Sequence, residues 1–253
     1  VYIIIFLLIL LTFDKYLFGG YQEYLIFSTL LISSRFITTI NFNKTIDHNK
    51  IFFILFLMHI LMWFKDEGIF YYLIFGSLLI FMQNCKFNIK LFYIVGILTV
   101  IFVQHYLQEN IIGIYGFSTE FLSEKLINQF LDFKIMIYKV FLITKHLFIA
   151  IIKYPIWIVI SISLIFTQIF NDKKNNYLKY FLYALIINVL FVYAIYINDP
   201  SPINNASSNG SELLYEFVLN VTLDRVIFQT SGFYILIFIL LLNKIIKINK
   251  KYD

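Results

Sequence analysis

The sequence predicts an all-α, polytopic bundle of transmembrane helices with about eight spans, plus interfacial helices on the outer face. Sixty per cent of the residues are hydrophobic and 14% are charged, whereas a soluble domain carries about 25% charged residues. Apolar runs recur along the whole chain, which excludes a soluble domain with one anchor. Runs such as 1–11 and 234–242 do not alternate apolar and polar residues as barrel strands would, so helices are expected.

The expected spans form a single transmembrane domain, 1–253, without an internal repeat. In order they are 1–17, 24–40, 51–64, 69–82, 91–106, 155–170, 177–197 and 226–243. The chain begins at Val1, already inside an apolar run and without a methionine, and we therefore expect it to be the C-terminal part of a longer protein. The single cysteine, Cys85, excludes an intramolecular disulfide framework.

The distribution of basic residues predicts the orientation of the spans. With Val1 on the cytoplasmic side, the cytoplasmic ends carry 12 basic and three acidic residues, and the opposite ends carry eight basic and 12 acidic residues. Lysine and arginine concentrate in cytoplasmic loops, so the count supports both the orientation and the number of spans. The formal net charge of +5 follows from this distribution, and no nucleic-acid partner is expected.

The segment 107–154 differs from the rest because charged residues are spread among its apolar ones. Lys134, Lys145 and Lys153 would not all be comfortable at mid-bilayer depth. We interpret 119–153 as amphipathic helices along the outer interface, with Pro155 opening the next span. The alternative is a true span at 135–152, which would reverse the downstream orientation and place Lys247 outside, against the count of basic residues.

Three polar turns on the predicted outer side are candidate sites. The first, Trp63–Gly68, contains Lys65, Asp66 and Glu67 and separates two runs of only about 14 residues, or about 21 Å of helix. Because this is short of a roughly 30 Å hydrocarbon core, the charges would lie below the outer surface and need partners or water. The alternative is an ordinary charged loop whose flanking runs end in the headgroups.

The second turn, Asp14–Glu23, contains Gly19, Gly20 and Tyr21, and Glu23 would begin a helix. A carboxylate at a helix N-terminus is favoured by the macrodipole, so Glu23 is either a site residue or only a capping charge. The third candidate is Asp224 with Arg225, before the last span. They form either a simple interfacial pair or a lipid-phosphate site, since a guanidinium suits phosphate.

The remaining polar residues give weaker signals. His48, His59, His105 and His146 lack metal-ligand spacing, so no metal site is assigned to them. No phosphate-binding glycine loop and no HExxH motif occurs in the sequence.

Gly-Gly-Tyr-Gln-Glu at 19–23 resembles the GYxD turn of bacterial GT-C-type glycosyltransferases, relatives of the dolichyl-phosphate-mannose protein mannosyltransferases. WFKDEG at 63–68 is similar to their later W-T-K-x-E-G turn, and Asp224-Arg225 to their late (D/E)-R position. Two positions depart from the pattern: Glu23 stands for Asp, and Phe64 for Thr. The family's catalytic carboxylate lies in its first outer loop, so the resemblance implies a base upstream of Val1 and leaves the catalytic residue of this chain unknown.

The resemblance implies transfer of a sugar from a polyprenyl-phosphate donor to an acceptor on the periplasmic side of a bacterial inner membrane. Substrate-binding residues would then be Tyr21, Glu23, Lys65, Asp66, Glu67, Asp224 and Arg225. In this assignment Lys65 and Arg225 neutralise phosphate, while Asp66 and Glu67 orient Lys65, the acceptor or a cation. Some relatives use a divalent metal, which these two carboxylates would hold. No other cofactor is expected.

Two functions of other classes stay open at this point. A membrane transporter would favour charged residues at mid-membrane depth and an internal repeat, and the sequence shows neither. A non-catalytic membrane subunit of a larger complex would leave the acidic residues on the outer side without a specific role.

Overall fold

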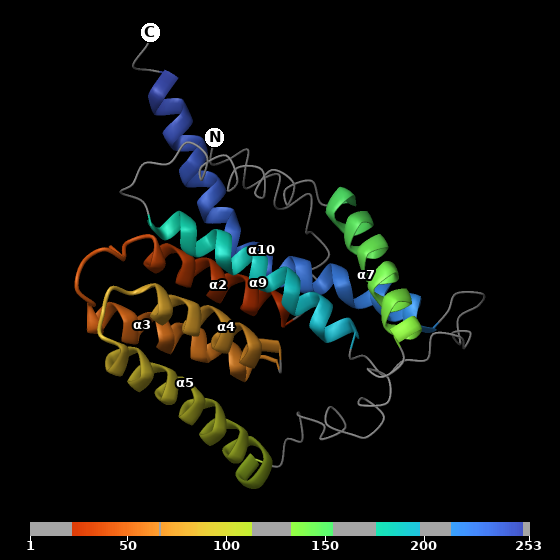
Figure 1. Cartoon of the computed structure of the whole chain (residues 1–253), viewed down its shortest axis with the longest axis horizontal. Helices are drawn as coiled ribbons and strands as arrows, with labels where there is room; N and C mark the ends of the chain where they lie inside the picture. Colours follow the sequence, from red (N-terminus) through yellow and green to blue (C-terminus); the bar gives the residue numbers. More distant parts are fainter. Residues whose placement is uncertain (1–21, 66, 113–132, 154–175, 198–213, 250–253) are drawn as a thin grey trace.

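The computed structural model describes residues 22–65, 67–112, 133–153, 176–197 and 214–249, and every element in these ranges is a helix (Figure 1). The elements are α2 (Glu23–Ile37), α3 (His48–Ile60), the 3-10 turn η1 (Leu61–Trp63), α4 (Glu67–Met82), α5 (Phe87–Leu107), the π-helical turn η2 (Gln108–Ile112), α7 (Phe133–Lys153), α9 (Asn176–Ile197) and α10 (Leu214–Asn249). The prediction of an all-helical fold is confirmed for these residues.

Three helices in the described ranges are long and apolar enough to cross a membrane, as a membrane protein requires. They are 87–112, 133–152 and 177–197, while α3 with η1 and α4 are apolar but shorter. The expected spans 24–40, 51–64, 69–82, 91–106 and 177–197 each coincide with a helix to within a few residues. The expected spans 1–17 and 155–170 lie outside the described residues, so the number of eight spans stays a prediction.

Helix α2 packs closely against α10 along a shared seam. The rings of Phe27 and Phe228 stack with centroids 5.0 Å apart and planes at 2°. A Cβ at Gly232 would lie 2.2 Å from the carbonyl oxygen of Phe27, so only glycine permits the two backbones to approach this closely. Glu23 and Arg225 lie just before this contact on their helices. The seam therefore fixes the position of one relative to the other along the two helices.

Aromatic side chains fill the space between α4, α9 and α10. Phe233 stacks on Phe75 at 4.3 Å and lies 4.9 Å from Phe181, and the Tyr180 hydroxyl donates to the Phe75 carbonyl at 2.9 Å. All four side chains are fully buried. The hydrogen bond satisfies the one polar atom that the tyrosine brings into this apolar layer.

Helix α10 begins earlier than the sequence analysis predicted. The expected span was 226–243, but the helix starts at Leu214. Tyr215, Leu219 and Leu223 are buried and recur every fourth residue, which is the spacing of one helix face. That periodicity was present in the sequence, but the charged residues Glu216, Asp224 and Arg225 between these positions obscured it.

Two parts of the predicted interfacial segment 107–154 are described. Residues 107–112 continue α5 through η2, and 133–153 form the single helix α7. Since α7 has the length and apolarity of a span, the alternative span at 135–152 also fits. Figure 1 shows α7 inclined to α9. The interfacial position stays a prediction.

Two lysines of α7, Lys139 and Lys145, have partners within the protein. Lys139 is buried, donates to the Ile197 carbonyl at 3.2 Å and lies 5.1 Å from the centre of the Tyr215 ring. Lys145 pairs with Glu216 at 3.2 Å. These contacts weaken the argument against a span that was drawn from the lysines, because an ionisable group inside a membrane is tolerated when it is paired.

Cysteine labelling in a Cys85→Ser background separates the two positions of α7. If α7 lies along the outer interface, cysteines at positions 125 and 145 should both react with an impermeant maleimide added from outside, because amphipathic helices keep their polar face in water. A cysteine at position 87, on the predicted cytoplasmic side, is the control and should stay protected. Protection of 125 and 145, with 153 labelled only from the cytoplasm, would show that α7 is a span.

Candidate functional site

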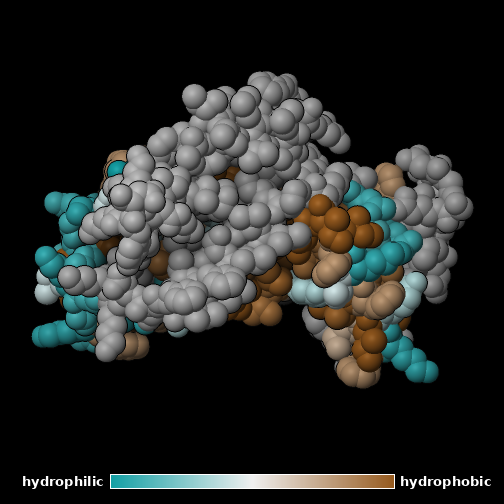
Figure 2. All heavy atoms as spheres, turned by 90° about the horizontal axis from the view of Figure 1, so that it is seen from above, coloured by the Kyte–Doolittle hydropathy of each residue, from teal (hydrophilic) through white to brown (hydrophobic). Residues whose placement is uncertain are grey.

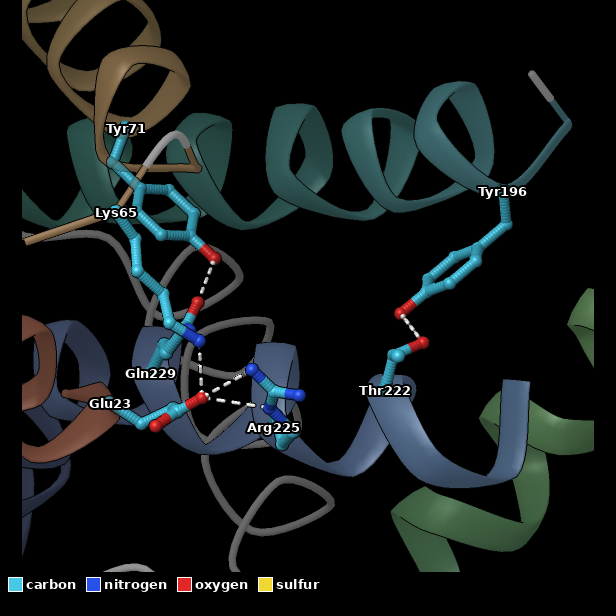
Figure 3. Close-up of polar contacts among 7 residues, drawn as sticks. All are labelled: Glu23, Lys65, Tyr71, Tyr196, Thr222, Arg225 and Gln229. Atoms are coloured by element: carbon cyan, nitrogen blue, oxygen red, sulfur yellow. Dashed lines mark hydrogen bonds and ion pairs between the residues drawn. The ribbon is translucent and has the colours of Figure 1, made fainter. Parts of the chain in front are cut away.

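The carboxylate of Glu23 is the centre of a buried ionic cluster (Figure 3). Its Oε1 accepts a hydrogen bond from the Lys65 ammonium at 2.5 Å and from Arg225 Nε at 2.7 Å. Arg225 Nη2 lies at 2.7 Å from the same oxygen. Three segments that are distant in sequence therefore meet at one atom: the start of α2, the turn before α4 and the middle of α10.

A tight turn places Lys65. The residue follows η1, and its carbonyl accepts a hydrogen bond from the Gly68 amide at 2.9 Å. A Cβ on Gly68 would lie 2.0 Å from the Leu61 carbonyl oxygen, so the first turn of α4 rests directly on the backbone of η1. The final glycine of the WFKDEG segment thus has a structural role: it closes the hairpin that presents Lys65 to Glu23.

A second polar pair lies one helical turn further along α10. Gln229 follows Arg225 by four residues on α10 and so lies on the same face. Its Oε1 accepts a hydrogen bond from the Tyr71 hydroxyl of α4 at 2.9 Å, and both side chains are fully buried. This bond ties α4 to α10 beside the ionic cluster, as Figure 3 shows.

The cluster has one more positive than negative charge among Glu23, Lys65 and Arg225. Exposure differs sharply within it: the Glu23 side chain is 1% exposed, Lys65 17% and Arg225 34%. The anion is therefore enclosed while a part of the guanidinium reaches the surface. The N-terminus of α2 adds a further partial positive charge, so the accessible side of this cluster favours an incoming anion.

Electrostatics hold Glu23 in its ionised form. Glu23 precedes the apolar run 24–40, and burial alone would raise the pKa of its carboxyl. Hydrogen bonds from Lys65 and from the backbone, with the charges of Lys65 and Arg225, outweigh burial and lower that pKa below its ordinary value. A carboxylate held in this way orients its two cations and is a poor proton acceptor.

The structure brings together three of the seven predicted site residues, Glu23, Lys65 and Arg225. Tyr21 and Asp66 lie outside the described residues. Glu67 begins α4 and Asp224 lies beside Arg225 on α10, both half-buried. The carboxylate that contacts Lys65 is Glu23, whereas the sequence analysis assigned that role to Asp66 and Glu67. Within the described ranges no three His, Cys, Asp or Glu side chains form a metal-binding group.

A second cluster was not predicted from the sequence. Glu216 on α10 pairs with Lys145 at 3.2 Å and lies 3.8 Å from Nε2 of the buried His146, both on α7. The sequence analysis placed Lys145 in an interfacial segment and assigned no site to His146, and only the tertiary contact between α7 and α10 reveals their partner. Their arrangement joins two helices and leaves a largely exposed lysine, which fits a structural role.

Comparisons with protein families, with characterised proteins and with solved structures find no match to this chain. Its function is therefore argued from the cluster around Glu23.

Proposed function

We propose that this chain is part of a membrane glycosyltransferase of the GT-C type that takes a sugar from a polyprenyl-phosphate donor. Lys65 and Arg225 would hold the donor's phosphate on the periplasmic side of a bacterial inner membrane. The observation that carries the proposal is the convergence of these two cations, from distant segments, on one buried carboxylate oxygen. A phosphate group is small, so it can contact both cations only if they lie this close together.

The chemistry of the two cations suits a phosphate. The Arg225 guanidinium uses Nε and Nη2 on Glu23 and is still about one-third exposed. Its planar fork has five N–H donors, so it can bind a second oxyanion while it keeps the first. Lys65 adds a compact positive charge beside it, and the single carboxylate neutralises only one of the two.

The location suits a donor with a lipid tail. The cluster lies at the start of α2 and at the turn before α4, both on the predicted outer side of eight spans. The phosphate of a polyprenyl chain lies at the same boundary, where the apolar tail enters the bilayer. The long apolar helices are suited to a membrane, and such a tail requires one.

Glu23 is assigned a positioning role in this proposal. Its lowered pKa makes it a poor general base, because a base must have a pKa near the working pH to accept a proton efficiently. A different group must therefore accept the proton of the acceptor hydroxyl. Glu23 instead holds Lys65 and Arg225 close together, which orders two long side chains before the donor arrives. Its own negative charge opposes the donor's phosphate, and we expect this effect of charge to be the larger of the two.

Binding of polyprenyl phosphate to the protein in lipid nanodiscs tests the site. Lys65→Ala and Arg225→Ala should each weaken binding roughly tenfold or more, because each removes a charge-assisted contact. Arg225→Lys should recover only part of the affinity, since it keeps the charge without the planar fork. Lys86→Ala, at the opposite end of the molecule, is the matched control and should bind as the wild type does.

A control ligand and a turnover assay complete the binding experiment. The corresponding polyprenol, which lacks the phosphate, should bind weakly to the wild type and to all four variants. Equal affinity for polyprenyl phosphate in wild type, Lys65→Ala and Arg225→Ala would reject the site. A full-length protein that binds the phosphate ligand and yet does not turn over polyprenyl-phosphate sugar is the other outcome to test for. That result would overturn the proposed enzymatic activity and indicate a non-catalytic binding subunit.

A further inference from the structure

A cavity of about 530 Å³ lies at the end of the helices opposite to the Glu23 cluster. The connection between α2 and α3, the start of α3 and one residue after α4 form its walls. Its lining residues are Thr39, Ile40, Asn41, Lys44, Thr45, Ile46, Asp47, Lys50, Ile51 and Gln83. In Figures 1 and 2 this end, at the left of both views, holds the connection between α2 and α3 and is mostly hydrophilic.

The polar groups of the cavity favour an anion. Asp47 caps α3 by accepting from the Lys50 amide at 3.2 Å, and it pairs with the Lys50 ammonium at 3.5 Å. The charge of Asp47 is thus balanced locally. Within the described part of the chain Lys44 has no ion-pair partner, which leaves one positive charge in excess. The positive end of the α3 dipole adds to it.

Exposed aromatic rings lie on α2 and α3, the two helices on either side of the connection that lines the cavity. Phe36 on α2 and Phe53 on α3 meet edge to face with ring centroids 4.8 Å apart. Both remain more than one-third exposed, and Phe52 beside them is 71% exposed. A polar cavity with room for a lipid headgroup therefore lies beside two helices that carry exposed aromatic rings. A molecule with a charged head and an apolar tail matches both parts.

We propose that this cavity binds the phosphate headgroup of an anionic phospholipid of the cytoplasmic leaflet. Lys44 and Lys50 contact the phosphate, and an acyl chain lies along Phe36 and Phe53. The location agrees with the predicted orientation, in which this end of the bundle faces the cytoplasm and its anionic lipids. The inference does not depend on the proposed transferase, because the two sites lie at opposite ends of α2 and share no residue.

Native mass spectrometry of the detergent-purified protein tests the inference. Wild type should bind phosphatidylglycerol in preference to phosphatidylcholine with the same acyl chains. Lys44→Glu should weaken phosphatidylglycerol binding roughly tenfold, because it replaces a contacting charge by a repelling one. Lys86→Glu makes the same change of charge at the same end but outside the cavity, and it should weaken binding by only about twofold. Both lysines are exposed, so both variants should fold.

The other arms separate a lipid from a free anion. Phe53→Ala should weaken phosphatidylglycerol binding and leave the binding of inorganic phosphate unchanged. Inorganic phosphate that binds as tightly as the lipid would overturn the assignment to a phospholipid. Equal losses in Lys44→Glu and Lys86→Glu, or no preference between the two lipids, would overturn the cavity as a specific site and show only a general effect of surface charge.

Discussion

Replacing Glu23 by glutamine should lower the free energy of unfolding by about 3 kcal/mol while it strengthens the binding of phosphate ligands. The loss of stability follows because Lys65 and Arg225 would keep their charges without a counter-ion. Removing one partner of a buried pair costs about 3–5 kcal/mol, and the lower end applies since Lys65 and Arg225 remain partly solvated. The gain in binding follows because both cations then lack an internal anion.

The two changes in opposite directions distinguish a ligand site from a structural ion cluster. Denaturant unfolding in detergent measures the stability, and polyprenyl-phosphate binding in nanodiscs measures the affinity. Glu216→Gln is the matched control, because Glu216 pairs with the half-exposed Lys145 at a different place. It should cost about 1 kcal/mol and leave phosphate binding unchanged. A Glu23→Gln protein that folds but binds phosphate more weakly than the wild type would contradict the proposed role of the cations.

Gly68→Ala should destabilise the protein by roughly 3 kcal/mol, because a new methyl group has no space against a rigid backbone. The added Cβ would lie 2.0 Å from the Leu61 carbonyl oxygen and 2.9 Å from the Met62 nitrogen. The start of α4 must then move away from η1. Since the turn between them carries Lys65, we also expect this variant to lose polyprenyl-phosphate binding.

The matched control is Gly96→Ala on α5, where nothing lies within 4 Å of the added Cβ. This substitution should be neutral or stabilising by up to about 1 kcal/mol, because alanine favours a helix over glycine. Thermal unfolding of the two variants in the same detergent provides the comparison. Midpoints that shift equally in Gly68→Ala and Gly96→Ala would show that the hairpin is not closed by the contact described here.

The sequence was sufficient to locate most helices because their apolar runs are long and are separated by polar turns. Where charged residues are interleaved with apolar ones, the sequence was less informative about the position of a helix. In α7 the interleaved lysines were interpreted as the mark of an interfacial helix, yet Lys139 is buried against the end of α9 and Lys145 pairs with α10. Composition gives the number of charges in a helix, but whether a charge faces lipid, water or another helix depends on tertiary packing.

For the candidate site too, some features could be predicted from the sequence and others depend on tertiary packing. Glu23, Lys65 and Arg225 could each be singled out because they are charged residues in turns next to apolar runs. That one oxygen of Glu23 binds both cations could not be predicted, because the partners are 42 and 202 residues away in the chain. Tyr71 is a further case: it looks like any aromatic residue of an apolar helix, and only the packing of α4 on α10 gives its hydroxyl a partner in Gln229.

The glycine seam between α2 and α10 determines which parts of the site can move. With the Phe27 carbonyl resting against Gly232, the two helices cannot slide past each other without a clash, so Glu23 and Arg225 form one rigid body. Lys65 belongs to the α3–α4 hairpin and joins that body through its flexible ammonium stem. In the proposed phosphate site the Lys65 side chain is therefore the part with the most freedom to move. Because Tyr71 and Gln229 tie α4 to α10 as well, a ligand that enters between the two cations would be admitted by rotation of the Lys65 side chain.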